Sequence, residues 1–264
     1  MNEPLTPAEP RRISVIIPCL NDAELLERCL HSFQTQLLPA DEIIVVDNGS
    51  TDNSAAIAHQ AGARVVTEPR RGITWATQTG FDAATGDILL RVDADTRAEE
   101  DFILRLHHAW EAAEKSPGRT VVGVTGSARF EIPGALGTIA TSLYLGAYRT
   151  SVGSALGHHP FFGTNYSIRA QWWHQIRDAV DFSDTYVHED MHLSFAVREN
   201  ETVWYQPDLL LSMDDRALHG FRQVLVRFHR GFYTMLRNWR THPPHLRLAQ
   251  RGVLGPRLKE VLKP

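Results

Sequence analysis

The chain has 264 residues, of which 43% are hydrophobic, and a formal net charge of −4. This length and apolar content suffice for one large domain or two small ones, which excludes a disordered tail or a fibre. Apolar runs stay well below the roughly 18 residues that a membrane-spanning helix needs, so we expect none.

The first ten residues contain three prolines and two glutamates, with no apolar stretch behind a basic start. We therefore expect a flexible N-terminus over residues 1–10, no signal peptide and a cytoplasmic location. The two cysteines, Cys19 and Cys29, have no metal-binding or redox spacing, and we expect both to be reduced and buried.

The first half of the chain alternates short apolar runs with helical patterns. The runs predict strands buried on both faces, over residues 13–18, 42–46, 64–67, 87–92 and 120–125. One apolar stripe predicts a helix over residues 22–36, and the turn Asn48-Gly49-Ser50-Thr51 precedes a second helix over residues 52–61. Such alternation predicts right-handed crossovers and a parallel sheet.

Ligands of parallel sheets bind beyond the carboxyl ends of the strands. Polar segments follow three predicted strands there, at residues 18–21, 47–52 and 93–95. No G-x-G-x-x-G follows the first strand and no P-loop signature occurs, which disfavours a dinucleotide dehydrogenase or a P-loop enzyme. A different nucleotide site is therefore needed.

Asp93 and Asp95 end the apolar run at residues 89–92. In an extended segment, residues i and i+2 point to the same side, so both carboxylates can face one point. Two carboxylates that close repel each other unless a cation lies between them. Mg²⁺ and Mn²⁺ prefer oxygen ligands and are often shared between carboxylates and phosphates, so we expect a metal and diphosphate site.

Beyond residue 126 the pattern loosens. Glycine and small residues dominate the segment 126–163, and a helix is predicted over residues 170–177.

Five motifs, in this order, resemble the inverting glycosyltransferases of family 2 with the GT-A fold, over roughly residues 13–204. They are Ser14-Val15-Ile16-Ile17-Pro18 with Asn21, Asp47-Asn48-Gly49-Ser50-Thr51-Asp52, Gly86-Asp87-Ile88-Leu89 leading into Asp93-Ala94-Asp95, Gly163-x-Asn165, and Glu189-Asp190-x-x-Leu193. The resemblance implies an α/β, Rossmann-like, mostly parallel sheet flanked by helices. It also implies one domain over residues 11–215, with a nucleotide-sugar half (11–125) and an acceptor half (126–215).

The same resemblance implies roles for individual residues. Asp95 and Asp93 would bind Mn²⁺ or Mg²⁺, with His219 as a candidate third ligand. Asp190 would be the general base that takes the proton of a hydroxyl acceptor, and Glu189 would orient or bind that acceptor. The residues expected to bind the nucleotide sugar are Pro18, Asn21, Asp47, Asn48, Arg71, Asp93, Ala94 and Asn165.

The chain departs from the family pattern at three places. Asn48 replaces a second Asp of the base loop, and Thr77 replaces the Arg of an Ala-Arg-Asn stretch, which leaves the nucleotide base open. The Q-x-x-R-W motif of processive synthases is absent, so we expect a single sugar to be added.

Two functions from other classes remain as alternatives. His188-Glu189-Asp190-Met191-His192 satisfies the H-E-x-x-H pattern of zinc metallopeptidases, although Phe195 and Arg198 break its longer form. A non-catalytic nucleotide-sugar-binding module would carry the same donor motifs.

The segment 216–264 is strongly basic, with nine arginines and two lysines against one acid, Glu260. Between residues 221 and 239 its apolar side chains repeat every three or four positions, which predicts an amphipathic helix with Arg222, Arg230, Arg237 and Arg240 on the opposite side. This helix could pack on the core or contact anionic lipid at the inner face of the cell membrane. An acceptor on an anionic lipid carrier would suit the second case. The acidic remainder of the chain disfavours nucleic acid as a partner.

Overall fold

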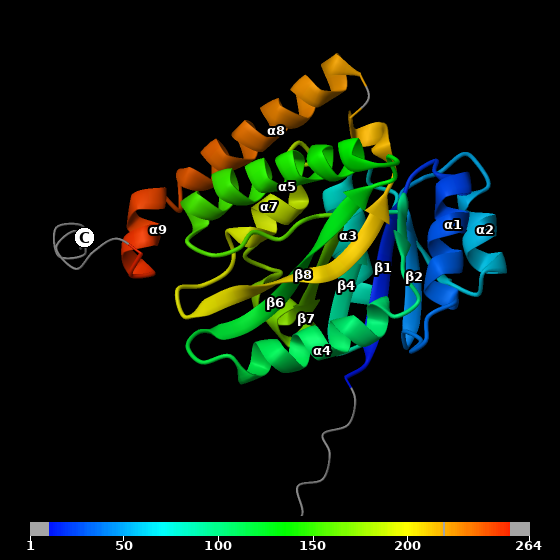
Figure 1. The fold of residues 1–264 in the computed structure, drawn as a ribbon, viewed down its shortest axis with the longest axis horizontal. Coiled ribbons are helices and arrows are strands. Elements are labelled where there is room, and N and C mark those ends of the chain that lie inside the picture. Colours follow the sequence, from blue (N-terminus) through cyan, green and yellow to red (C-terminus); the bar gives the residue numbers. More distant parts are fainter. Residues whose placement is uncertain (1–10, 219, 254–264) are drawn as a thin grey trace, which may run out of the picture.

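The computed structural model describes residues 11–218 and 220–253, so the expected flexible segment 1–10 and His219 lie outside the described residues. Within these ranges eight strands form one sheet in the order β3-β2-β1-β4-β7-β6-β8-β5 (Figure 1). The strands are β1 (Ile13–Cys19), β2 (Glu42–Asp47), β3 (Arg64–Thr67), β4 (Ile88–Val92), β5 (Thr96–Ala98), β6 (Thr120–Phe130), β7 (Asn165–Arg169) and β8 (Glu201–Met213).

Helices cover both faces of this sheet (Figure 1). They are α1 (Ala23–Gln34), α2 (Ser54–Gln60), α3 (Ile73–Ala83), α4 (Phe102–Lys115), α5 (Ala135–Leu156), α6 (Ala170–Ile176), α7 (Glu189–Ser194), α8 (Phe221–Trp239) and α9 (Pro244–Gln250), with a 3-10 turn η1 (Asp215–Leu218) before α8.

The first half of the sheet is parallel. β1 pairs with β2 and with β4, and β2 pairs with β3, all in parallel. Every residue of β1 and of β4 is buried, because helices cover both faces of the sheet here. The strands predicted over residues 13–92 and the mostly parallel α/β fold are confirmed.

The second half of the sheet is mixed. β7 runs antiparallel to β4 and to β6, whereas β8 runs parallel to β6. The prediction for β6 stopped five residues early, and β8 and α5 were not predicted. The glycine-rich composition of residues 126–163 hid both the end of β6 and the 22-residue α5.

Two hydrophobic clusters lie on opposite faces of the sheet. One joins β1 and β4 to α1 and α4, through Leu30, Phe33, Phe102 and others. The second joins β1, β2 and β7 to α3 and α6, with Trp173 at its centre. They fix the carboxyl ends of β1 and β4 relative to α7, which is what the site described below requires.

The C-terminal helices belong to this packed body. Arg247 and Arg251 of the α9 region are both buried, and they donate to backbone carbonyls of the loop after α7, such as those of Val197 and Arg198. These two arginines of the basic segment therefore serve the fold rather than an external partner.

Gly80 provides a test of the packing between α3 and the sheet. A Cβ at this position would lie 2.4 Å from Ile16 Cγ2 and 3.0 Å from Val46 Cγ2. We expect Gly80→Ala to lower the free energy of unfolding by about 1–3 kcal/mol, as overpacking of a core does. Urea denaturation measures the change.

Gly146→Ala in α5 is the matched control, because no described heavy atom lies within 4 Å of its Cβ position. Here the higher helix propensity of alanine should raise the free energy of unfolding by up to about 1 kcal/mol. Equal effects at both positions would contradict close packing of α3.

Candidate functional site

A cavity of about 750 Å³ lies where β1 and β4 end. Its walls also include residues of α7, the η1 turn and α8. Of the residues predicted for the site, those that line it are Pro18, Asn48, Arg71, Asp93, Ala94, Asp95, Glu189 and Asp190. The cavity thus brings together segments that lie far apart in the sequence, from Pro18 to Arg230.

Asp93 and Asp95 reach the cavity from the loop after β4. Asp93 Oδ1 accepts a hydrogen bond from Arg91 (2.6 Å), and its Oδ2 accepts one from Thr164 (3.0 Å). Asp95 Oδ2 accepts one from Arg216 (2.8 Å). Burial, followed by the negative charge of Asp93, raises the pKa of Asp95 to about 6 although Arg216 opposes the shift. The two carboxylates are therefore close enough to destabilise each other's charge.

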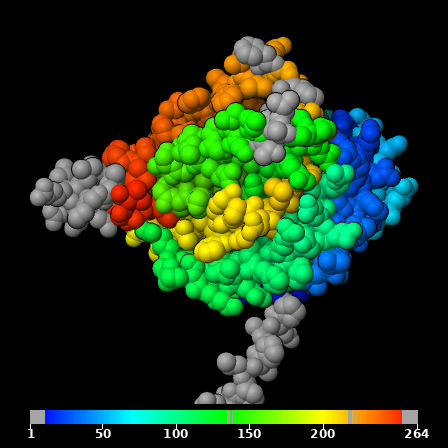
Figure 2. All heavy atoms as spheres, in the orientation of Figure 1, coloured from blue at the N-terminus to red at the C-terminus, as the bar shows by residue number. Residues whose placement is uncertain are grey.

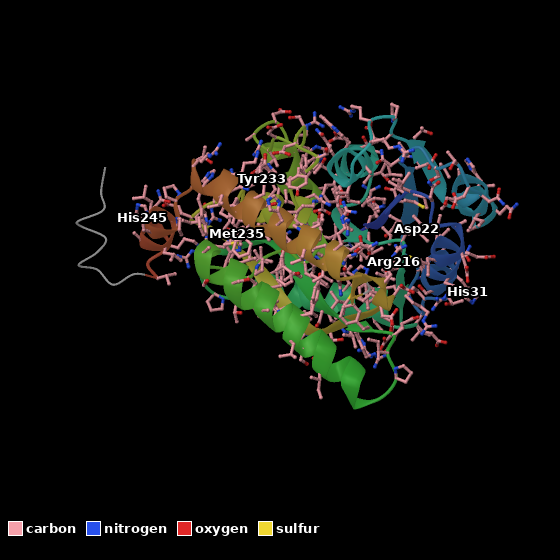
Figure 3. All side chains as sticks on the ribbon, turned by 90° about the horizontal axis from the view of Figure 1, so that it is seen from above. Asp22, His31, Arg216, Tyr233, Met235 and His245 are labelled. Atoms are coloured by element: carbon pink, nitrogen blue, oxygen red, sulfur yellow. The ribbon has the colours of Figure 1, made fainter. Side chains whose placement is uncertain are left out.

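Arg216 bridges two carboxylates at the edge of the cavity. Its guanidinium donates to both oxygens of Asp22, at the start of α1, as well as to Asp95. Figure 3 shows Asp22 and Arg216 next to each other. From the sequence we expected a boundary after residue 215, between the transferase domain and the basic tail. Arg216 lies beyond that boundary, yet it contacts Asp22 and Asp95 of the domain.

A buried ion pair lies beneath the acidic residues. Arg91, 3% exposed, donates to Asp93 and to the carbonyl of Gly163, and its Nε lies 2.9 Å from Glu189 Oε1. Burial raises the pKa of Glu189 to about 8, against the lowering effect of Arg91. Glu189 Oε2 has no hydrogen-bond partner among the described residues.

Asp190 is held at the cavity wall by two donors. Its Oδ2 accepts a hydrogen bond from the Gly163 backbone N–H (2.7 Å), and its Oδ1 accepts one from the Met191 backbone N–H (2.7 Å). The Tyr148 hydroxyl of α5 lies 3.1 Å from Oδ2 and 2.6 Å from the carbonyl oxygen of Phe161, so these two acceptors compete for its one proton. Burial, and then the charge of Asp190, raises the pKa of Tyr148 well above its ordinary value, so this phenol stays protonated and donates. The side chain of Asp190 is therefore fixed in direction.

Three predicted donor-binding residues do not line the cavity. Asn165 is fully buried, and its Nδ2 donates to the carbonyls of Ser127 and Leu209, so it ties β7 to β6 and β8. Our expectation that it faces the sugar is corrected, because the sheet occupies its side chain.

Asp47 and Asn21 serve the neighbouring turns instead. Asp47 Oδ1 accepts from the Ser50 N–H, and Asn21 Oδ1 accepts from the Thr51 N–H. Asn21 also has a left-handed backbone, with φ 55°. These bonds fix the two loops beside the cavity relative to each other, so the residues shape its entrance without lining it.

Asn48 lines the cavity, but its polar atoms are engaged. Its Nδ2 donates to the carbonyls of Glu68 and Arg70, and its Oδ1 accepts from the Gly72 N–H. Asn48 therefore orders the loop that carries Arg71. An Asp here could not donate either bond.

The two histidines of the H-E-x-x-H pattern do not form a zinc site. His188 pairs with the carbonyl of Arg227, and His192 pairs with Asn238 Oδ1, both on α8. Among residues 11–218 and 220–253, no group of three or more His, Cys, Asp or Glu is arranged to hold a metal ion. The peptidase alternative is not supported by this arrangement, and the candidate ligand His219 lies outside the described residues.

Several site residues were missed in the sequence. Arg91 carries a local signal, since it is a charge inside an otherwise apolar strand. Arg216 was assigned to the basic segment because its partners lie far away in the sequence. Tyr148 carries no local signal, because only the packing of α5 brings it to Asp190.

Known proteins resemble the chain in sequence over part of its length. Residues 14–132 match the model of the family described as Glycosyl transferase family 2. The uncharacterized glycosyltransferase Rv0539 of Mycobacterium tuberculosis is 43% identical over 84 residues, which are 31% of this chain and 36% of that protein. The protein RfbJ of Shigella flexneri is 39% identical over 83 residues, 31% of this chain and 64% of RfbJ. The matches thus span about a third of the mycobacterial relative and less than two thirds of RfbJ.

Solved structures resemble it over most of its length. The mannosyltransferase PcManGT from Pyrobaculum calidifontis, in complex with GDP-Man and Mn²⁺, has a TM-score of 0.63 at 19% identity and covers 97% of this chain and 79% of its own. Glucosyl-3-phosphoglycerate synthase from Mycobacterium tuberculosis, with Mn²⁺ and UDP, has a TM-score of 0.53 at 21% identity, covering 86% of this chain and 80% of its own. Residues 14–132 of the chain therefore resemble glycosyltransferase family 2, and the fold of the chain is the GT-A fold of glycosyltransferases.

Proposed function

We propose that this protein is a metal-dependent glycosyltransferase that moves one sugar from a nucleoside diphosphate to a hydroxyl acceptor, with inversion at the anomeric carbon. The observation that carries the proposal is that Asp93, Asp95 and Asp190 line one cavity at the carboxyl ends of the strands. The glycosyltransferase relatives support the reaction class. The neighbours bound to nucleotides and Mn²⁺ support the donor class.

Asp93 and Asp95 would hold a Mn²⁺ or Mg²⁺ ion. The residues fit such an ion, because both offer carboxylate oxygens to the cavity, where burial and then the charge of Asp93 raise the pKa of Asp95. A bound ion would offset the charge that builds on the departing diphosphate. Pro18, Ala94 and Arg71 line the same wall and would contact the nucleotide.

Asp190 would act as the general base. The acceptor O–H gives its proton to Asp190 as its oxygen forms the new bond to the anomeric carbon, and the bond from that carbon to the diphosphate breaks with its electron pair on the diphosphate. An attack from the side opposite the leaving group inverts the configuration. The backbone N–H groups of Gly163 and Met191 keep the carboxylate aimed at the cavity during this step.

Glu189 would position the site rather than accept the proton. Its side chain is 4% exposed and faces Arg91, which also holds Asp93. With its pKa raised to about 8, this carboxyl already carries a proton at neutral pH and cannot take up that of the acceptor. Glu189 and Arg91 together would fix the distance between the donor side and the acceptor side of the cavity.

The acceptor would carry an anionic group near its hydroxyl, as a phosphate-bearing lipid carrier does. Arg227 and Arg230 of α8 line the cavity, and Arg230 donates to the backbone carbonyls of residues 185–187. Cations at this wall would favour a phosphate. Such an acceptor would require the cavity to open at a bilayer.

Asp95→Asn should remove metal-dependent donor binding, because the amide supplies one neutral oxygen in place of a carboxylate. We expect the increase in melting temperature given by Mn²⁺ with a GDP-sugar or UDP-sugar to disappear, whereas a saturating ligand at 100 times its Kd stabilises by about 2.7 kcal/mol. A thermal-shift screen of nucleotide sugars with and without Mn²⁺ measures this effect.

Asp178→Asn is the control, since the Asp178 side chain is 97% exposed and does not line the cavity. It should leave the shift unchanged. A full shift in Asp95→Asn would contradict the assignment of this residue to the metal.

Asp190→Asn should lose transfer and keep donor binding. A positioned base is worth about 10²- to 10⁴-fold in rate, and the amide cannot take up the proton. Sugar transfer to acceptor and the donor-dependent melting shift are measured on the same preparation. If Asp190→Asn transfers sugar at the rate of the unmodified protein, another residue is the base. If the unmodified protein binds the donor but transfers sugar to none of the acceptors tried, the non-catalytic alternative is favoured.

Glu189→Gln should change the pH dependence of stability. The pKa of Glu189 rises from 4.5 to about 8 on folding, so between these values the folded state holds a proton that the unfolded state releases. The free energy of unfolding therefore falls as pH rises through this window, and the glutamine variant lacks this contribution. Urea denaturation between pH 5 and about 8 compares the two slopes.

Glu111→Gln on the exposed face of α4 is the control and should keep the slope of the unmodified protein. The same slope in Glu189→Gln would show that Glu189 is already ionised at low pH in the folded state.

A further inference from the structure

The amphipathic helix α8 turns its apolar side outward. Leu225, Phe228, Phe232 and Leu236 follow one another at intervals of three or four residues and are 51%, 60%, 65% and 58% exposed. Single exposed apolar side chains are common in proteins, but four on one helical stripe form a contiguous patch. Such a patch needs a partner.

The opposite side of α8 is polar and already engaged. Thr234 and Asn238 are buried, and they bind the backbone N–H of His188 and the ring of His192. Arg237 forms ion pairs with Asp181 and Asp184. The orientation of the helix is therefore fixed by polar contacts with the α7 region, and its apolar stripe cannot turn inward.

Two arginines depart from the expected pattern. All four arginines were expected opposite the apolar stripe. Arg230 and Arg237 lie there and face the protein, whereas Arg222 and Arg240 are exposed. Arg222 is three residues before Leu225 and Arg240 four residues after Leu236, so both lie next to the stripe on the helix surface. Positive charge thus flanks the apolar patch at both ends.

Helix α5 extends the patch. Ile139 and Leu143 are 54% and 70% exposed. Figures 1 and 3 place α5 and α8 on the same side of the molecule, converging near α9, and Figure 2 shows side chains of α5 (green) next to those of α8 (orange). In the first half of α5, where Ile139 and Leu143 lie, the Tyr144 hydroxyl is within hydrogen-bond reach of Arg227 of α8. We name Leu225, Phe228, Phe232, Leu236, Ile139 and Leu143 the α5/α8 surface.

The α5/α8 surface borders the cavity. Tyr144, next to Leu143, and Arg227, next to Phe228, both line it. A partner seated on the surface would therefore lie beside the cavity opening. In the part of the chain that the structure describes, no helix is both long and apolar enough to cross a bilayer.

The charge of the two helices indicates whether the partner of the α5/α8 surface is a lipid bilayer or a second copy of the chain. Neither α5 nor α8 contains an Asp or a Glu. A symmetric dimer through this surface would place arginines of one copy near those of the other with no acid on either helix to pair with them. Anionic lipid headgroups offer that complement, and the apolar side chains fit the acyl boundary beneath them.

We propose that the α5/α8 surface docks on an anionic lipid bilayer, with α8 lying in the plane of the interface and the cavity opening at the headgroups. The proposal does not depend on transfer, because binding is measured without donor or acceptor. A failure of bilayer binding would therefore not contradict the proposed transferase function, and a failure of transfer would not contradict bilayer binding.

Vesicle sedimentation with the full chain tests it, using phosphatidylcholine vesicles with and without phosphatidylserine. We expect tighter binding to the anionic vesicles and a loss of that preference at high salt. Phe228→Ser with Phe232→Ser should weaken binding by about 100-fold or more, because two buried rings at about 1.5–3 kcal/mol each sum to about 3–6 kcal/mol. Arg222→Gln with Arg240→Gln should weaken binding to anionic vesicles on the order of 30-fold, since two arginines near the surface at about 1 kcal/mol each sum to about 2 kcal/mol.

Matched controls come from other surfaces. Leu37→Ser removes an apolar side chain that is 69% exposed beyond the end of α1. Arg12→Gln with Arg64→Gln removes two exposed charges at the amino ends of β1 and β3. Both controls should bind as the unmodified chain does, and circular dichroism verifies that every variant is folded.

Three results would overturn the proposal. One is no binding to either vesicle type, and another is binding that the phenylalanine variant retains. The third is a dimer of the unmodified chain in analytical ultracentrifugation that does not form in the phenylalanine variant, together with no binding of the chain to vesicles. That result would assign the surface to a second copy of the chain.

Discussion

The arrangement of the cavity depends on the charge balance around Arg91. This one buried guanidinium, at the end of β4, contacts Asp93, Glu189 and the carbonyl of Gly163. Without it, Asp93 would lose its cationic partner and the buried Glu189 would face the charge of Asp93 alone. Removing one partner of a buried ion pair typically costs about 3–5 kcal/mol. The same contacts join the loop after β4, which would hold the donor, to α7, which would serve the acceptor. Stability and geometry of the site therefore have a common origin.

The parallel half of the fold could be predicted because its strands are nearly continuous apolar runs separated by helical stripes. Asp93 and Asp95 could be predicted for the same reason, since strand ends in such a sheet meet at one edge. The antiparallel half could not. β8 pairs with β5 and β6 at long range, and α5 is built of glycine, alanine and hydroxyl residues whose periodicity is weak.

The positions of side chains were likewise predicted correctly in some cases and not in others. Asn165 was expected in the cavity because it follows Gly163 in a motif, yet its position within β7 sends its amide to the backbone of β6 and β8. Arg216 was counted with a basic tail, although it neutralises Asp22 and Asp95. For α8 the periodicity predicted the helix limits and the apolar stripe, but which side faces the protein is decided by Asp181, Asp184 and the α7 region, which lie outside the helix.

Gly163 has the most restricted environment among the residues that hold Asp190. Its N–H binds the carboxylate of Asp190, its carbonyl binds Arg91, and a Cβ on it would lie 3.1 Å from Asp190 Oδ2. A methyl group there would push directly against this carboxylate oxygen. The backbone at this position thus sets the spacing between Arg91 and Asp190, and even the smallest side chain would change that distance.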